Sequence, residues 1–255
     1  MANPLKERLK AGQPAIGCWV SIPDPAVMEI LAELGPDWLM IDTEHGPADD
    51  ATVENLLRAA KGTPVVPLVR VAANDPALIK KALDRGARGV LVPLVSSPEE
   101  AERAVQACRY PPLGIRGVAG SRANRYGLDL SEYFEHWNED VLVGCQVETA
   151  PALARVEAIA GVPGVDLLFV GPNDLSAALG CFRQFSHPDY QQALNRVVQA
   201  ARAAGVAAGY MASGPEEARL RIEQGFQFVS LSSDARLLQA AARRAFEAVR
   251  SAVAG

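Results

Sequence analysis

Residues 38–45, WLMIDTEH, run from an apolar segment straight into two acids and a histidine. The same order recurs along the chain: VVPLVR ends in Arg70, and VLVGCQVE ends in Gln146 and Glu148. A fourth segment, VDLLFVGPND, brings Asp174 just past its apolar run. If these runs are parallel strands of one sheet, their carboxyl ends lie on one side, where such sheets place their chemistry. These polar side chains are therefore expected to converge.

Short apolar, β-rich runs alternate with longer segments of helical period, as in repeated strand-helix units around a parallel sheet. Strands are predicted at residues 15–21, 37–42, 64–70, 88–93, 141–148, 165–171, 205–211 and 226–232. Helices are predicted at residues 24–34, 50–61, 75–85, 97–108, 151–160, 187–204, 215–224 and 234–250. The 255 residues match the usual length of an eight-unit barrel, so we expect one (β/α)8 TIM-barrel domain over residues 1–255.

Helix boundaries carry their own signals. Asn74, Ser97 and either Ser213 or Gly214 are candidates to accept the first free N–H groups of a helix. Prolines suited to a first helical turn are Pro76, Pro98, Pro151 and Pro215, and glycines suited to helix ends are Gly35, Gly62, Gly86, Gly205 and Gly225. Residues 110–140 interrupt the alternation of strands and helices and are predicted to form a long loop that contains a short helix. A loop of this length is usually functional or forms an interface.

The composition argues against several classes of function. A net charge of -5 with no basic cluster offers no general attraction to nucleic acid or acidic membranes. The N-terminus lacks the apolar segment of a secretory signal, and no apolar run is long enough to span a bilayer, so a cytoplasmic protein is expected. The four cysteines form no C-x-x-C pair, which favours reduced, mostly buried thiols over a zinc site or disulfides.

Side-chain alternation along VLVGCQVE puts Gln146 and Glu148 on one face and Cys145 and Val147 on the other. In a barrel the first pair points inward near the mouth, and an unpaired carboxylate there needs a cation or a donor. The plain alternative is a salt bridge from Glu148 to an arginine.

Asp174 follows Gly171, Pro172 and Asn173, ahead of a short helical turn that is expected to begin at Leu175. Small residues let a backbone approach a ligand closely, and N–H groups at a helix start can hold an anion. The alternative is that Asn173 or Asp174 only caps the helix. Glu148 and Asp174 together, with no cysteine nearby, would form a hard oxygen site suited to Mg²⁺ or Mn²⁺, with water and substrate as further ligands.

His45 is the one histidine of three at a predicted strand end, and its expected role is that of a proton acceptor near neutral pH. Asp84 or Asp42 could orient its ring. Arg70 offers fixed positive charge for a developing oxyanion; it could equally neutralise Glu44 or Asp42, or do both. None of the five lysines ends a strand, so a Schiff-base mechanism has no placed amine.

The chain resembles the HpcH/HpaI aldolase family from about Gly17 to Leu238. The motifs that carry the resemblance occur in order: IDTEHGP, LVRV, IKKALDRGARGVLVPLV, RYPPLGIRG, SRANRYG, QVET, GVDLLFVGPNDLSAALG and GFQFVSL. Members of this family are metal-dependent class II aldolases that use pyruvate, of the 4-hydroxy-2-oxo-heptanedioate or 2-dehydro-3-deoxy-sugar-acid aldolase type. The segments CFRQFSHPDY and MASGPEE depart from the family pattern and are expected to influence the acceptor preference.

The resemblance implies a TIM barrel whose last helix packs on a neighbouring subunit, commonly in a hexamer built as a trimer of dimers. It implies that Glu148 and Asp174 hold Mg²⁺ or Mn²⁺, with Co²⁺ as a further candidate. It makes His45 the base, Asp84 the residue that raises its basicity, and Arg70 the group that stabilises the enolate. Substrate contacts would come from Gln146 and from the backbone of Asn173 and Asp174.

The implied reaction is the reversible aldol cleavage of a 4-hydroxy-2-oxo acid to pyruvate and an aldehyde through a metal-stabilised pyruvate enolate. Trp19, Phe169 and residues 110–140 are weaker candidates to shape the aldehyde side. Two alternatives remain at this point: an acyl-CoA lyase of the citrate-lyase-β type, which would want a basic docking surface, and a non-catalytic barrel that binds an oxo acid, which would not need His45.

Overall fold

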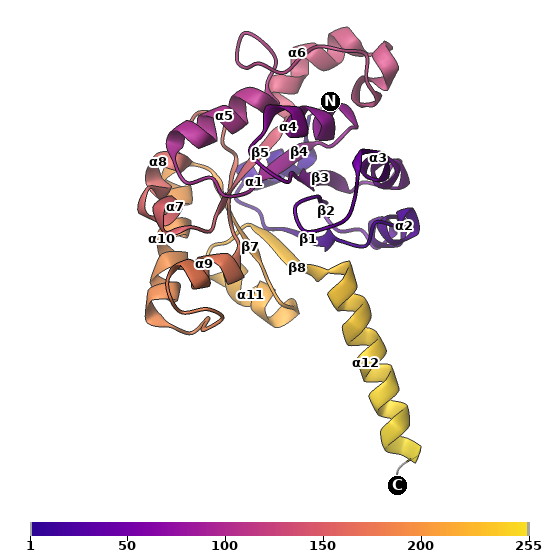
Figure 1. Ribbon diagram of the computed structural model, residues 1–255, viewed down its shortest axis with the longest axis vertical. Coiled ribbons are helices and arrows are strands. Elements are labelled where there is room, and N and C mark those ends of the chain that lie inside the picture. The colour runs from indigo at the N-terminus through magenta and orange to yellow at the C-terminus, as the bar shows by residue number, and fades with distance from the viewer. Residues whose placement is uncertain (1, 254–255) are drawn as a thin grey trace.

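The structure, a computed structural model that describes residues 2–253, is a closed barrel of eight parallel strands in the order of the chain (Figure 1). The strands are β1 Ala15–Val20, β2 Trp38–Asp42, β3 Val66–Arg70, β4 Gly89–Val92, β5 Leu142–Val147, β6 Leu167–Val170, β7 Ala207–Met211 and β8 Phe228–Ser233. All eight predicted strands are confirmed, and so is the barrel. Because every strand is parallel to its neighbours, the loops after the strands lie at one end of the barrel.

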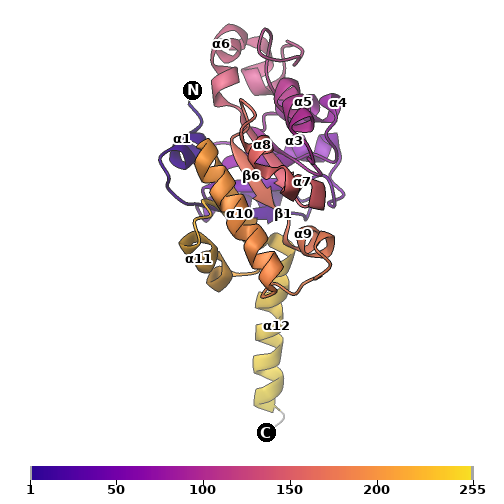
Figure 2. The ribbon, with the colours of Figure 1, turned by 90° about the vertical axis from the view of Figure 1, so that its left-hand side faces the viewer.

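Helices surround the barrel and connect its strands (Figures 1 and 2). Their bounds are α1 Pro4–Lys10, α2 Pro25–Glu33, α3 Asp50–Ala59, α4 Pro76–Asp84, α5 Pro98–Cys108, α6 Leu130–Asp140, α7 Ala150–Ala154, α8 Val156–Ala160, α9 Pro172–Ala178, α10 Pro188–Ala204, α11 Pro215–Glu223 and α12 Asp234–Val253, with a 3-10 helix, η1, at Arg122–Gly127. The helix predicted at residues 151–160 is two short helices, α7 and α8, separated by Arg155. Within residues 2–253, no helix has the length and apolarity needed to cross a membrane.

Helix boundaries follow the sequence signals with one correction. The four prolines occupy first turns, Ser97 caps α5, and all five glycines have positive φ. Asn74 is not a cap, because the side chain of Asp75 accepts the N–H groups of Ala77 and Leu78 at the start of α4. The side chain of Asn74 instead donates to the carbonyl of Glu100 in α5.

The strands separate two buried apolar clusters, an inner one inside the barrel and an outer one between strands and helices. Trp38 and Phe228 stack at 3.9 Å in the inner cluster. Trp38 lies so close to Gly17 that any Cβ on residue 17 would overlap the indole, so only glycine fits there. Cys145 and Val147 belong to the outer cluster, as side-chain alternation predicts.

Helix α1 closes the amino end of the barrel, opposite the loops that follow the strands. Leu5 and Leu9 pack on the inner cluster, and the buried Lys6 donates to the carbonyl of Val141 at 2.9 Å and pairs with Asp166 at 3.0 Å. Lysine is rarely buried unless it is paired in this way. Helix α1 therefore covers the amino end of the inner cluster, and the polar strand ends lie at the opposite, carboxyl end of the barrel.

Candidate active site

Arg70, the last residue of β3, is held rigidly at the mouth of the barrel. Its Nε and Nη2 atoms donate to the two carboxylate oxygens of Asp42 at 3.0 and 2.6 Å, and its Nη1 atom lies 2.9 Å from Oε2 of Glu44. The guanidinium carbon lies 4.5 Å from the ring centre of Trp19. The expectation that Arg70 neutralises Glu44 or Asp42 is confirmed, because it pairs with both acids. A planar fork held on three sides can present its remaining N–H groups in a fixed direction.

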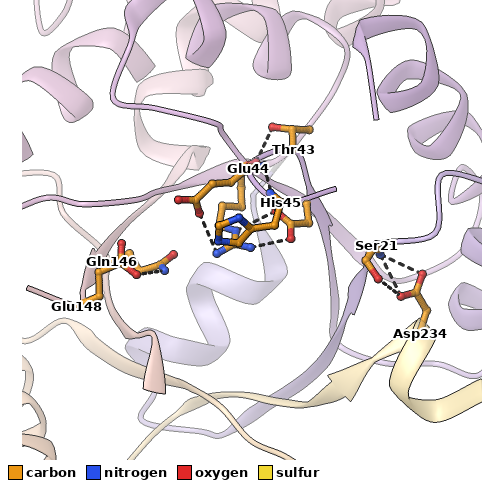
Figure 3. A network of polar contacts seen from close by, with 9 residues as sticks. Ser21, Thr43, Glu44, His45, Gln146, Glu148 and Asp234 are labelled. Atoms are coloured by element: carbon orange, nitrogen blue, oxygen red, sulfur yellow. Dashed lines mark hydrogen bonds and ion pairs between the residues drawn. The ribbon is translucent and has the colours of Figure 1, made fainter. Parts of the chain in front are cut away.

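His45 lies beside this ion pair, exposed at the mouth. Its backbone N–H, like that of Glu44, points to Oδ1 of Asp42, at 3.3 and 3.1 Å. Asp42 therefore fixes the turn that carries both side chains. Figure 3 shows Glu44 and His45 between the Gln146 and Glu148 pair on one side and a second pair, Ser21 and Asp234, on the other.

Glu148, just past the end of β5, is 4% exposed and accepts the backbone N–H of Leu94 at 2.8 Å and the side-chain amide of Gln146. Burial raises the pKa of Glu148, and the charges of Glu44 and Asp174 act in the same direction. Within the described residues no arginine pairs with Glu148, so the plain salt-bridge alternative was wrong. The carboxylate is buried, hydrogen-bonded on both oxygens and short of positive charge.

Asp174 lies in the first turn of α9, and the helix begins earlier than expected. Gly171 is the N-cap and Pro172 opens the helix, so the interpretation of Asn173 or Asp174 as the cap was wrong, as was the start at Leu175. A Cβ on residue 171 would lie 2.8 Å from Oε2 of Glu148, so any other residue there would force the Glu148 carboxylate to move. The turn after β6 thus packs directly against the Glu148 carboxylate.

These acids fit a hard divalent ion. Burial raises the pKa of Glu44 as well, although Arg70 opposes the effect, and Oε2 of Glu44 and Oε1 of Gln146 are buried without a hydrogen-bond partner. Across residues 2–253, no three or more His, Cys, Asp or Glu side chains form a ready-made cage. Mg²⁺ needs none, because one or two carboxylates commonly hold it while water and substrate complete its shell. The donor set of Glu148 and Asp174 meets that requirement.

Asp84 lies away from His45, at the end of α4. Its Oδ1 atom accepts a hydrogen bond of 2.7 Å from Arg116, whose side chain is fully buried among aromatic rings, with Trp137 at 4.5 Å. In the described part of the chain, no hydrogen bond or ion pair joins Asp84 to His45. In a single chain, the acid that contacts the His45 turn is Asp42.

Two features of the mouth were missed from sequence. The N–H of Leu94 reaches Glu148 because Leu94 has a positive φ of 54°, and nothing in a leucine signals that conformation. Asp234 accepts hydrogen bonds from the backbone N–H groups of Ser21 and Ile22 and from the Ser21 hydroxyl (Figure 3). An aspartate at the first position of a predicted helix is a known capping signal, and this contact could have been sought.

Comparison with known proteins finds relatives over nearly the whole chain. The family model for HpcH/HpaI aldolase/citrate lyase matches residues 15–241. A hydroxypyruvate/pyruvate aldolase of Paraburkholderia phytofirmans is 43% identical over 98% of both chains. A 5-keto-4-deoxy-D-glucarate aldolase of Escherichia coli is 42% identical over 95% of this chain and 94% of its own.

Among solved structures, an HpcH/HpaI aldolase/citrate lyase family protein from Burkholderia cenocepacia superposes with a TM-score of 0.94 at 43% identity. That match covers 98% of this chain and all of the other. The resemblance therefore extends over sequence, fold and nearly the full length. The chain belongs to the HpcH/HpaI aldolase/citrate lyase family and is a carbon-carbon lyase.

Proposed function

We propose that the protein is a divalent-metal-dependent class II aldolase that reversibly cleaves a 4-hydroxy-2-oxo acid to pyruvate and an aldehyde. One observation carries the proposal: a buried, arginine-free carboxylate, Glu148, shares the mouth of the barrel with a guanidinium fixed by Asp42 and Glu44. The Glu148 carboxylate suits a cation, and the Arg70 guanidinium suits an oxyanion. The names of the relatives support the same reaction class.

The residues at the mouth of the barrel have different proposed roles, which follow from their chemistry. Arg70 donates two N–H groups to Asp42 and pairs through Nη1 with the charge of Glu44, so N–H groups remain that can donate to the 2-oxo oxygen. When bound between Glu148 and Asp174, a divalent ion supplies Lewis-acid stabilisation of negative charge on the substrate. The side-chain amide of Gln146 already donates to Glu148, and its buried Oε1 has no hydrogen-bond partner, which leaves that oxygen available to the substrate.

His45 is the proposed base. In the synthetic direction His45 takes a proton from the methyl group of pyruvate, the resulting enolate carbon forms a bond to the aldehyde carbon, and the aldehyde π bond opens so that its oxygen takes the proton back from His45. In the cleavage direction His45 accepts the proton of the 4-hydroxyl, the bond between C3 and C4 breaks, and the 4-oxygen becomes the aldehyde carbonyl. The electron pair of the broken bond forms the enolate, whose methylene carbon then takes the proton from His45. Both directions need the enolate oxygen to be stabilised, which is the role of Arg70.

Exchange of the methyl protons of pyruvate with deuterated solvent tests this proposal, because it needs no aldehyde. We expect exchange by proton NMR with Mg²⁺ or Mn²⁺ present and its loss on adding EDTA. His45→Ala is expected to abolish exchange while Mn²⁺ binding by calorimetry stays near normal. His136→Ala, a change of an exposed histidine on α6, is the matched control.

Each failure has its own meaning. Exchange that EDTA does not affect would contradict the metal requirement. The absence of any exchange would favour the non-catalytic barrel. A large loss of Mn²⁺ affinity in His45→Ala would make the histidine a ligand rather than the base.

We further propose that the enzyme works in the cytoplasm as a homo-oligomer, with a hexamer as the expected state. Support comes from α12, which projects away from the barrel in both ribbon views (Figures 1 and 2). Of its described residues only Asp234 is buried. An amphipathic helix with its apolar side exposed in this way is typical of an interface.

A further inference from the structure

The two segments that depart from the family pattern, residues 181–190 and 211–217, are joined by a buried polar network. Tyr190 lies on α10 and Tyr210 on β7, and their hydroxyl oxygens are 3.0 Å apart. Both tyrosines are fully buried. The network continues from Tyr210 to Glu217 in the first turn of α11, with Oη and Oε1 3.0 Å apart.

The direction of these hydrogen bonds follows from counting protons. An ionised carboxylate only accepts, so the Tyr210 hydroxyl must donate its single proton to Glu217. Tyr190 must therefore donate to Tyr210. Burial raises the pKa of Tyr210 to about 12, so its proton stays in place at neutral pH. The network has one consistent arrangement, and buried hydrogen bonds that are chained in this way reinforce one another.

Arg221, one turn further along α11, neutralises the carboxylate. Its Nη2 atom lies 2.9 Å from Oε1 of Glu217 and 3.3 Å from the Tyr210 hydroxyl, and its guanidinium carbon lies 4.4 Å from the Tyr210 ring centre. Arg221 is 3% exposed. A buried arginine is costly unless it is paired, and here Arg221 is matched to the half-buried Glu217.

The second oxygen of Glu217 holds the loop after β7. Oε2 accepts the backbone N–H of Ser213 at 2.9 Å and its hydroxyl at 2.7 Å. Hydrogen bonding to Ser213 and the charge of Arg221 outweigh burial, so that the pKa of Glu217 lies below its ordinary value. Oε1 thus faces the network and Oε2 faces the loop.

The β7–α11 loop, residues 212–214, borders the mouth of the barrel. It follows β7 at the same end as the Gly171 turn, because β6 and β7 are parallel neighbours. Met211 packs against the inner cluster that contains Trp19 and Phe169, and Ala212 is bonded to the carbonyl of Ser230 at 3.1 Å. Ser213 is thus two residues from the side chain that packs next to those aromatic rings.

We propose that Glu217 and Arg221 are positioning residues that fix the β7–α11 loop as one wall of the aldehyde-binding part of the mouth. This inference rests on the proposed function for its kinetic consequence but not for its structural one. Neither residue touches the groups assigned to pyruvate. Their loss should therefore affect the aldehyde step and spare the enolisation of pyruvate.

Glu217→Gln is the decisive variant, since the single acceptor oxygen of an amide cannot accept from Tyr210 and Arg221 on one side and from Ser213 on the other. With pyruvate and glycolaldehyde we expect KM for glycolaldehyde to rise about tenfold, as loss of one charge-assisted hydrogen bond implies. We expect kcat to change by less than about twofold, and methyl exchange of pyruvate to stay at the wild-type rate. Glu216→Gln, on the same helix and exposed, is the matched control.

Amide hydrogen exchange tests the structural part of the inference without an enzyme assay. The Ser213 amide should exchange roughly tenfold faster in Glu217→Gln than in the wild type, and should not change in Glu216→Gln. Ser213→Ala, an exposed change that removes only the hydroxyl contact, should raise KM for glycolaldehyde in the same direction but less. Ser213→Ala therefore tests the inference even if Glu217→Gln does not fold.

An unchanged KM for glycolaldehyde with normal pyruvate exchange would overturn the inference alone. An unchanged Ser213 amide would overturn it whatever the enzyme does. If the wild type does not exchange the methyl protons of pyruvate, the proposed function is refuted instead. The hydrogen-exchange rate of the Ser213 amide in Glu217→Gln would still show whether Glu217 holds the loop.

Discussion

At the scale of single residues, Arg70 shows why residue type matters more than charge. Its planar group meets Asp42 with two parallel hydrogen bonds, contacts Glu44 with a third N–H, and lies over Trp19. Lysine carries the same charge as a point on a flexible stem and cannot reproduce this geometry. The fixed direction of the guanidinium is what allows it to stabilise an oxyanion that forms only during reaction.

Arg70→Lys is therefore expected to lower the turnover of pyruvate methyl exchange by roughly a hundredfold, the usual cost of losing a preorganised oxyanion donor. The pyruvate concentration that gives half-maximal rate should change much less. Steady-state NMR exchange assays measure both quantities. Arg58→Lys, an exposed arginine paired with Glu54 on α3, serves as the control. Equal effects of the two substitutions would remove Arg70 from the site.

Much of the candidate site could be predicted from sequence at this scale, because parallel strands bring their carboxyl ends together whatever their order along the chain. That rule gathered Glu44, His45, Arg70 and Glu148 at one mouth. It could not predict that the loop after β4 bends back with a positive φ at Leu94 to reach Glu148. Nor could it predict that Asp84 pairs with Arg116, since that contact depends on how the 110–140 segment packs.

At the scale of elements, strands and the longer helices were predictable because each has a clear apolar period bounded by proline and glycine. Helix α1 was missed because it is short and only two apolar residues, Leu5 and Leu9, mark its inward side. The third buried residue, Lys6, and the charged residues around it make the segment look polar. The lysine is buried only because Val141 and Asp166 lie at the adjacent strand starts, which no local pattern reveals.

Leu5→Ala tests whether α1 seals the barrel. Leu5 is 1% exposed within the inner cluster, so its truncation leaves a cavity and should cost roughly 2–5 kcal/mol of unfolding free energy. Urea titration followed by tryptophan fluorescence measures this, because Trp38 lies in the same cluster. Leu113→Ala, at a leucine that is 58% exposed, should cost less than about 0.5 kcal/mol. A cost for Leu5→Ala as small as that of the control would show that α1 is not part of the core.

At the scale of the whole molecule, α12 is the element that the barrel does not explain. Leu238, Phe246, Val249 and Val253 recur at helical spacing and are each more than 60% exposed. Such a stripe on a helix that leaves its own barrel is unfavourable in water, and burial against a second copy of the chain removes it. The hydrogen bonds from Ser21 to Asp234 fix the direction in which α12 projects from the barrel. Every copy of the chain therefore presents the apolar stripe in the same orientation.

Size-exclusion chromatography with light scattering should accordingly find a multiple of the subunit mass, with six as the expected number. Phe246→Glu places a charge in the stripe and should lower the assembled mass while leaving the barrel folded by circular dichroism, because α12 beyond its first residue contributes no buried side chain to its own barrel. Arg244→Glu, an exposed change on the opposite side of the same helix, should leave the mass unchanged. A wild-type monomer, or a Phe246→Glu protein of unchanged mass, would mean that the stripe is not the assembly surface and that contacts elsewhere must account for any oligomer.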